Sequence, residues 1–171
     1  MITMNEVKQN VNRGVYDDNY VKAMIADDFF LVRLHETAHA IVHETLNPES
    51  EWIIKMKPDY KNNRIAHTEY ITDSINNVDI FDRMRVTLAG YVIERMIGIS
   101  YMNAYRSAHD DYLRFNKYMK HYYGNIAITE YNNAKNRIIS DDERIISENL
   151  DRIMMITNRL HDVHMLSSSE L

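Results

Sequence analysis

The chain contains no cysteine among its 171 residues. This absence excludes disulfide bonds, a catalytic thiol and every zinc site built on cysteine. Histidine, aspartate and glutamate are therefore the only strong zinc ligands that remain. The chain also lacks a Lys/Arg-rich block, and its formal net charge is −5. Nucleic acid is accordingly a poor candidate for its main partner.

Long apolar runs are missing, and glycine and proline are scarce. No stretch approaches the roughly 20 apolar residues of a membrane span, and the polar start MITMNEVKQN does not resemble a signal peptide. We therefore expect a cytoplasmic protein without a membrane span. With 45% hydrophobic residues and a length of 171, the chain predicts a single domain over 1–171 with a core of its own.

With only 4 Gly and 2 Pro, breaks are few and long helices are expected. Apolar residues at helical spacing predict helices over about 17–26, 28–46, 79–97 and 109–123. The stretches 51–57 and 64–71 predict a hairpin, because turn-forming residues separate them. Residues 99–108 are expected to form a loop and 129–139 a helical stretch. Ser140 to Glu143 reads as a capping box that opens a last helix to about 164, before a frayed tail. The predicted fold is mainly α with a small β-hairpin.

The most informative motif is His35-Glu36-Thr37-Ala38-His39, within the predicted helix 28–46. Residues four apart share one face of a helix, so both imidazoles can reach one metal ion. Glu36 points elsewhere and can hold a metal-bound water, whose proton it would accept. Chance produces about 0.02 such patterns in a chain of this composition. The motif therefore indicates a zinc hydrolase.

A catalytic zinc ion normally takes three protein ligands and leaves one position open, so a third ligand must come from elsewhere. His43 lies one turn beyond His39, but a straight helix cannot wrap three successive turns around one ion. The extended motif with a third histidine needs a glycine that is missing here. The candidates that remain open are Glu94, Asp110, Asp111, His67 and His109.

Three segments occur in the same order as in a known family. Residues 33–43 read RLHETAHAIVH, residues 88–98 read LAGYVIERMIG, and residues 107–112 read SAHDDY. They resemble the HEAGHA, GGRAAEELIFG and GASNDL segments of the FtsH-type peptidases, the protease domains of membrane-anchored AAA zinc proteases. The resemblance covers about 28–124 and leaves 125–171 as a helical C-terminal extension with a short flexible tail. It implies a zincin-like HExxH helix in an FtsH-peptidase-like helical domain.

The resemblance also implies roles for individual residues. The family's aspartate ligand falls on Asp111, although a slightly shorter helix count leaves Asp110 open. The family's glutamate in AAEEL falls on Glu94, which implies a position beside the site where it would orient a ligand imidazole. His67 or His109 would help to stabilise the oxyanion. The chain departs from the family in having no G-x-x-x-x-G-K-[ST] loop, so it carries no recognisable ATPase.

These patterns predict a zinc-dependent endopeptidase that cleaves protein or peptide substrates without its own ATPase. Zn²⁺ would be bound by His35, His39 and Asp111, and Glu36 would activate the attacking water. One alternative is a non-enzymatic peptide- or protein-binding module that retains the peptidase fold. Another is a zinc peptidase in which Glu94 is the third ligand. The chain would act alone, as a homo-oligomer or beside a separate partner protein.

Overall fold

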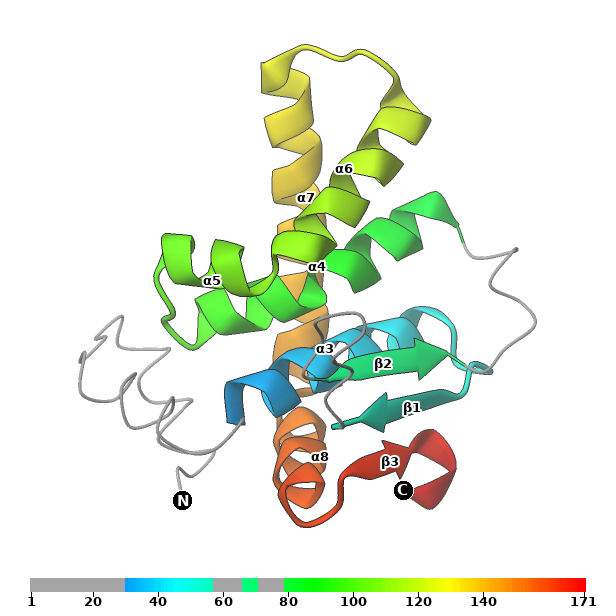
Figure 1. Cartoon of the computed structure of the whole chain (residues 1–171). Helices are drawn as coiled ribbons and strands as arrows, with labels where there is room; N and C mark the ends of the chain where they lie inside the picture. The colour runs from blue at the N-terminus through cyan, green and yellow to red at the C-terminus, as the bar shows by residue number, and fades with distance from the viewer. Residues whose placement is uncertain (1–29, 57–65, 71–78) are drawn as a thin grey trace.

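The computed structural model describes residues 30–56, 66–70 and 79–171. It is mainly helical with a small antiparallel sheet, as the sequence predicts (Figure 1). Its helices are α3 (Phe30–Leu46), α4 (Ile80–Met96), α5 (Tyr101–Ser107), α6 (His109–Tyr123), α7 (Ile128–Glu148) and α8 (Leu150–Asp162). Its strands are β1 (Trp52–Lys55), β2 (His67–Tyr70) and β3 (Met165–Ser167), followed by the 3₁₀ turn Ser168–Glu170.

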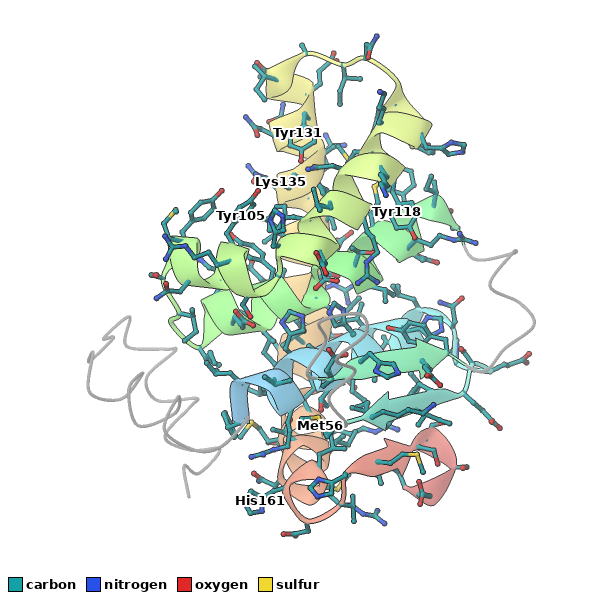
Figure 2. All side chains as sticks on the ribbon, in the orientation of Figure 1. Met56, Tyr105, Tyr118, Tyr131, Lys135 and His161 are labelled. Carbon is teal, nitrogen blue, oxygen red and sulfur yellow. The ribbon has the colours of Figure 1, made fainter. Side chains whose placement is uncertain are left out.

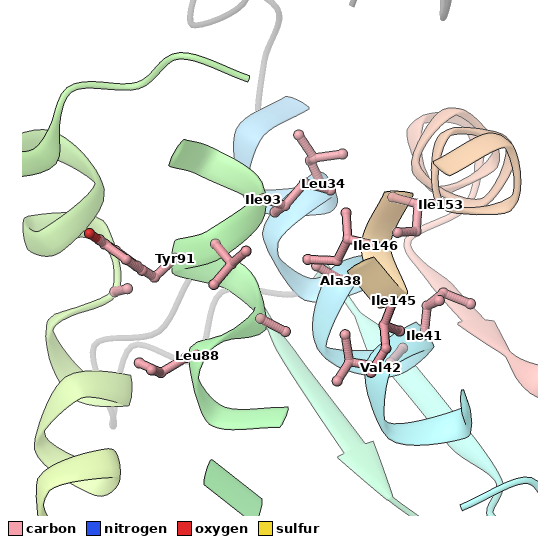
Figure 3. Packing of buried hydrophobic residues seen from close by; sticks show 14 of the residues in the cluster. Leu34, Ala38, Ile41, Val42, Leu88, Tyr91, Ile93, Ile145, Ile146 and Ile153 are labelled. Atoms are coloured by element: carbon pink, nitrogen blue, oxygen red, sulfur yellow. The ribbon is translucent and has the colours of Figure 1, made fainter. Parts of the chain in front are cut away.

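Helix α3, which carries the HETAH motif, lies at the centre of the core. It packs against α4 on one side and against α7 and α8 on the other (Figure 3). Its apolar residues recur at intervals of three and four, so one broad stripe of the helix is buried. That stripe includes Leu34, Ala38, Ile41 and Val42. Because α3 is enclosed in this way, the positions of His35 and His39 are fixed by the core.

The ends of α4 and α6 agree with the sequence prediction, and each has a local cause. At the start of α4 the side chain of Asp79 accepts a hydrogen bond from the backbone N–H of Phe81. At the end of α6, Gly124 adopts a φ of 66°, a left-handed conformation that costs glycine little. α6 then turns back into α7, and the two form the upright pair at the top of Figure 1.

The sheet has the strand order β2-β1-β3, so β2 is an edge strand that lies alongside α3 (Figure 1). β1 and β2 pair antiparallel, with Trp52 opposite Tyr70 and Lys55 opposite His67. The predicted hairpin is thus confirmed with shorter strands. Its expected turn at 58–63 lies outside the described residues, as does the predicted helix at 17–26.

The predicted loop at 99–108 is wrong, because most of it forms helix α5. Ser100 caps this helix by accepting a hydrogen bond from the backbone N–H of Asn103. Ala104 is fully buried and attaches the helix to the core. The helix is only seven residues long and buries Ala104 alone, while Tyr101 and Met102 are exposed, so it has no core-facing apolar stripe for the sequence pattern to detect.

The predicted helix start at Ser140 is also wrong, because α7 runs through this position to Glu148. Asp141 accepts two hydrogen bonds from the Arg85 guanidinium on α4, and Asp142 is fully buried. These polar residues resemble a helix cap in sequence, but they face neighbouring helices. The break comes at Asn149, which separates α7 from α8.

The predicted frayed tail is wrong as well. Residues 165–167 form β3, which pairs antiparallel with β1, and Leu166 is buried opposite Ile54. Ser167 and Glu170 form a capping box in the turn that follows. Among the described helices, none has the length and apolar character needed to cross a membrane.

Candidate metal and catalytic site

Three atoms able to act as metal ligands (donor atoms) converge where α3 meets the first turn of α6. The Nε2 atoms of His35 and His39 lie 3.0 Å apart. Oδ2 of Asp111 lies 3.0 Å from Nε2 of His35 and 3.4 Å from Nε2 of His39. All three residues are buried, and among the described residues they form a group able to hold a metal ion. The structure thus brings together the two motif histidines and the aspartate suggested by the resemblance.

The second ring nitrogen of each histidine has its own partner. Nδ1 of His35 lies 2.8 Å from Oε1 of Glu94, and Nδ1 of His39 lies 2.5 Å from the carbonyl oxygen of Val86. Because both partners only accept hydrogen bonds, we assign the proton to Nδ1 in each ring. The Nε2 lone pairs are then directed at the point that they share with Asp111. This tautomer is the one that binds a metal through Nε2.

Glu94 lies on the opposite side of the His35 ring from Asp111. It is 1% exposed, and the hydroxyl of Ser107 donates a hydrogen bond to its Oε1 at 2.7 Å. A carboxylate in this position orients a ligand imidazole and raises its basicity. The geometry therefore favours an orienting role for Glu94 over that of a third ligand.

Gly90 allows His35 to occupy its place against α4. A Cβ atom built on Gly90 would overlap the His35 imidazole ring. Any side chain at this position would therefore have to displace the ring that carries Nε2. Within the LAGYVIERMIG segment, glycine is needed here for this close approach and not for its backbone angles.

The electrostatics of the three residues indicate that a positive charge belongs between them. Burial lowers the pKa of His35, but the neighbouring carboxylates of Asp111 and Glu94 outweigh it and raise that pKa well above its usual value. Burial raises the pKa of Asp111, but His39 and His35 outweigh it and hold the pKa far below its usual range. The two shifts have one cause, because the carboxylates favour a positive charge on His35 and the imidazoles favour a negative charge on Asp111.

The spacing of the three donor atoms fits a small tetrahedral ion. Bonds of about 2.0–2.1 Å at tetrahedral angles separate neighbouring ligand atoms by about 3.4 Å. The observed separations of 3.0, 3.0 and 3.4 Å require shifts of only a few tenths of an ångström. These residues can therefore hold a metal ion and leave a fourth position open towards the cavity.

Glu36 is not part of this group but lines the same cavity, where β2 holds its side chain. The Thr68 hydroxyl lies 2.7 Å from Oε2 of Glu36 and 3.0 Å from the backbone oxygen of the same residue. A hydroxyl group that donates to a carboxylate oxygen makes a strong, short hydrogen bond. Thr68 was not among the residues that the motif analysis singled out. It belongs to a different element and shows no signal in the sequence, because only the packing of β2 on α3 brings it to Glu36.

A cavity of about 600 Å³ opens over the site. His35, His39, Glu36 and Asp111 line it on the α3 and α6 side, and β2 borders it on the other. The cavity is therefore bounded by the three proposed ligands, the proposed base and an edge strand.

The other candidates lie elsewhere or have other partners. Asp110 is exposed and borders the cavity, but it is not part of the group that could hold a metal ion. His109 is exposed on α6, and its ring packs against Tyr105. Nε2 of His67 is paired with Glu69 at 2.9 Å. His43 is buried and shares a 2.7 Å hydrogen bond with the Ser50 hydroxyl, so it is a packing residue.

The remaining histidines are surface residues. They are His121, His161 and His164. Figure 2 shows His161 at the end of α8 remote from α6.

A comparison with the models of known protein families finds none that matches this chain, and a search of the curated proteins finds no match either. Function has to be inferred from the geometry of the site together with the motif resemblance.

Proposed function

We propose that this chain is a zinc-dependent endopeptidase, similar to the FtsH-type peptidases, that acts without its own ATPase. The observation that carries the proposal is the convergence of His35, His39 and Asp111 in a cavity that Glu36 also lines. Two imidazoles and a carboxylate with an open fourth position are a typical catalytic zinc set. Ca²⁺ and Mg²⁺ prefer sites made of oxygen ligands, so the donor chemistry favours zinc.

A zinc ion in this site would supply a Lewis acid and lower the pKa of water at its open position. Glu36 accepts a proton from the attacking water as the oxygen–carbon bond forms. It then delivers that proton to the amide nitrogen as the carbon–nitrogen bond breaks. Because Thr68 holds Oε2 of Glu36, Oε1 is the atom placed to carry the proton. Glu94 keeps the His35 ring in the orientation that directs Nε2 into the site.

The substrate proposed for this site is an extended segment of a protein or peptide. β2 is an edge strand, and its residues His67, Thr68 and Tyr70 line the cavity. An edge strand offers unpaired backbone groups to which an extended chain can add as a further strand. A peptide bound to β2 in this way would lie across the cavity beside Glu36 and the three proposed ligands. Strand addition of this kind requires a substrate segment that is already unfolded or that a partner delivers in unfolded form.

The proposal is tested with the purified chain loaded with one equivalent of Zn²⁺ and incubated with casein and a peptide library. We expect Glu36→Gln to retain zinc and to lose activity by about 10²–10⁴-fold, because the base is gone and the ligands are intact. We expect His39→Ala to lose zinc and activity together. The exposed His121→Ala is the matched control and should behave like the wild type. Cleavage by Glu36→Gln at the wild-type rate would refute the mechanism.

The ligand set is tested by zinc stoichiometry in Asp111→Ala and Glu94→Ala, with the exposed Asp110→Ala as control. Asp111→Ala should lose the metal. Glu94→Ala should keep a zinc ion bound about 10–100-fold more weakly, as expected for a residue that orients a ligand. Zinc loss only in Glu94→Ala would instead identify Glu94 as the third ligand. Stoichiometric zinc without cleavage of any substrate would favour the non-enzymatic binding module.

A further inference from the structure

The side chains of β2 divide between its two faces. His67 and Glu69 lie on one face, where their side chains are paired. Successive side chains of a strand point to opposite faces, so Thr68 and Tyr70 share the other face. Thr68 contacts Glu36 on α3. The face of β2 that carries Tyr70 is therefore the one turned towards the helix of the HETAH motif.

The ring of Tyr70 is held against α3 by His43. The two rings lie 3.9 Å apart between centroids, with an interplanar angle of 62°. His43 is itself fixed, because it is buried and bonded to Ser50. It lies one turn beyond His39 on the helix, and Tyr70, His43 and His39 all line the same cavity. The Tyr70 ring thus has a defined position beside the site.

The hydroxyl of Tyr70 is left without a hydrogen-bond partner among the described residues. Burial raises the pKa of Tyr70 well above its usual value, and the negative charges of Glu36 and Asp111 add to the rise while Arg114 opposes it. Tyr70, Glu36 and Asp111 all line the same cavity, which is the geometric basis for this electrostatic effect. The phenol remains protonated and is available as a donor.

We propose that the Tyr70 hydroxyl donates a hydrogen bond to the oxyanion formed in peptide hydrolysis. The inference rests on the proposed function. When the water oxygen bonds to the carbonyl carbon, the π electron pair moves onto the carbonyl oxygen. A donor aimed at that oxygen stabilises the transition state more than the substrate. Tyr70 keeps its own proton, and the proton removed from water still passes through Glu36 to the leaving nitrogen.

The sequence suggested His67 or His109 as the donor to the oxyanion, but neither is as well placed as Tyr70. Nε2 of His67 is engaged with Glu69, on the strand face opposite to Tyr70, while its buried Nδ1 has no hydrogen-bond partner among the described residues. In the tautomer whose Nε2–H donates to Glu69, Nδ1 carries a lone pair and cannot donate to an oxyanion. His109 is exposed and packs on Tyr105. Tyr70 combines a fixed ring, a place in the cavity wall and a hydroxyl that no described residue engages.

The test is Tyr70→Phe in the full zinc-loaded chain, because this change removes only the hydroxyl. We expect kcat to fall by about 10²–10³-fold, the effect of losing one oxyanion donor. KM for a peptide substrate should stay within about threefold, since the ground state does not need the donor. Zinc stoichiometry and the unfolding temperature should not change. Binding of a peptide phosphonate, whose anionic tetrahedral centre mimics the transition state, should weaken by at least about tenfold.

Tyr122→Phe, an exposed tyrosine outside the cavity, is the matched control. Wild-type kcat and phosphonate affinity in Tyr70→Phe would overturn the role of Tyr70 while leaving the proposed function intact. A fall in kcat with an equal loss of zinc would overturn it too, because the hydroxyl would then support the metal ligands. If the wild type neither retains zinc nor cleaves any peptide, the proposed function fails and the role of Tyr70 fails with it.

Discussion

Asp142 lies in the core, on the face of α7 that carries Ile138, Ile145 and Ile146. Its exposure is 0%, and neither carboxylate oxygen has a hydrogen-bond partner among the described residues. Burial is the main reason that its pKa is raised well above the usual value; Arg85 opposes the rise. Because that guanidinium is already bonded to another carboxylate, Asp142 is best accommodated as the neutral acid.

The raised pKa of Asp142 predicts the direction in which the free energy of unfolding changes with pH. In the unfolded chain an aspartate ionises near pH 3.9, whereas in the folded protein Asp142 still holds its proton above that pH. The native state therefore binds more protons than the unfolded state. From about pH 4 upwards, up to the pKa of the folded state, the free energy of unfolding falls by up to about 1.4 kcal/mol per pH unit. Asp142→Asn cannot ionise, so it should lose this term and exceed the wild type in stability by a margin that grows with pH.

The assay is urea unfolding of metal-free protein at pH 4, 5 and 6, since chelation removes any contribution of a bound ion. Taking the difference between variant and wild type cancels the titration of all other groups. Asp141→Asn is the control at the neighbouring residue, and we expect it to change the free energy of unfolding in the opposite direction. It removes the partner of Arg85 and should destabilise by up to about 1 kcal/mol, the usual range for a partly exposed pair. A difference between Asp142→Asn and wild type that stays constant across these pH values would refute the reasoning.

Two further predictions concern the site. Gly90→Ala should weaken zinc binding by at least about tenfold, because its methyl group must displace the His35 ring. Competition with a chromophoric chelator measures the zinc affinity of the variant. An unchanged affinity would contradict the packing argument. Thr68→Val keeps the β-branched shape but removes the hydroxyl that holds Glu36. Thr68→Val should lower kcat/KM by about 10–100-fold with zinc retained, and Thr68→Ser should keep most of the wild-type kcat/KM. Equal rates in all three proteins would show that the hydrogen bond to Glu36 does not contribute to catalysis.

Local patterns predicted the long helices because each pattern is complete within its own segment. The stripe on α3, the cap at Asp79 and the stop at Gly124 need no information from distant residues. The three errors share the opposite property. Ala104 of α5, Asp141 of α7 and Leu166 of β3 each take their structural role from a partner elsewhere in the chain.

The motif by itself determined which residues can carry the chemistry. Histidines four residues apart on a helix share a face in any fold, so His35 and His39 could be paired from the sequence, with Glu36 assigned to a different direction. The tertiary structure decided the rest. The docking of α6 on α4 places Asp111 at the two Nε2 atoms, and the packing of α4 on α3 places Glu94 behind His35.

The same distinction explains Thr68 and Tyr70. Nothing in the sequence marks these two residues as part of a site, and their side chains reach α3 only because β2 packs along that helix at one register. A strand shifted by one residue would turn both side chains to the other face. The identity of the two candidate histidine ligands is thus a property of the sequence. The positions of the groups that orient them depend on long-range packing, which no local pattern encodes.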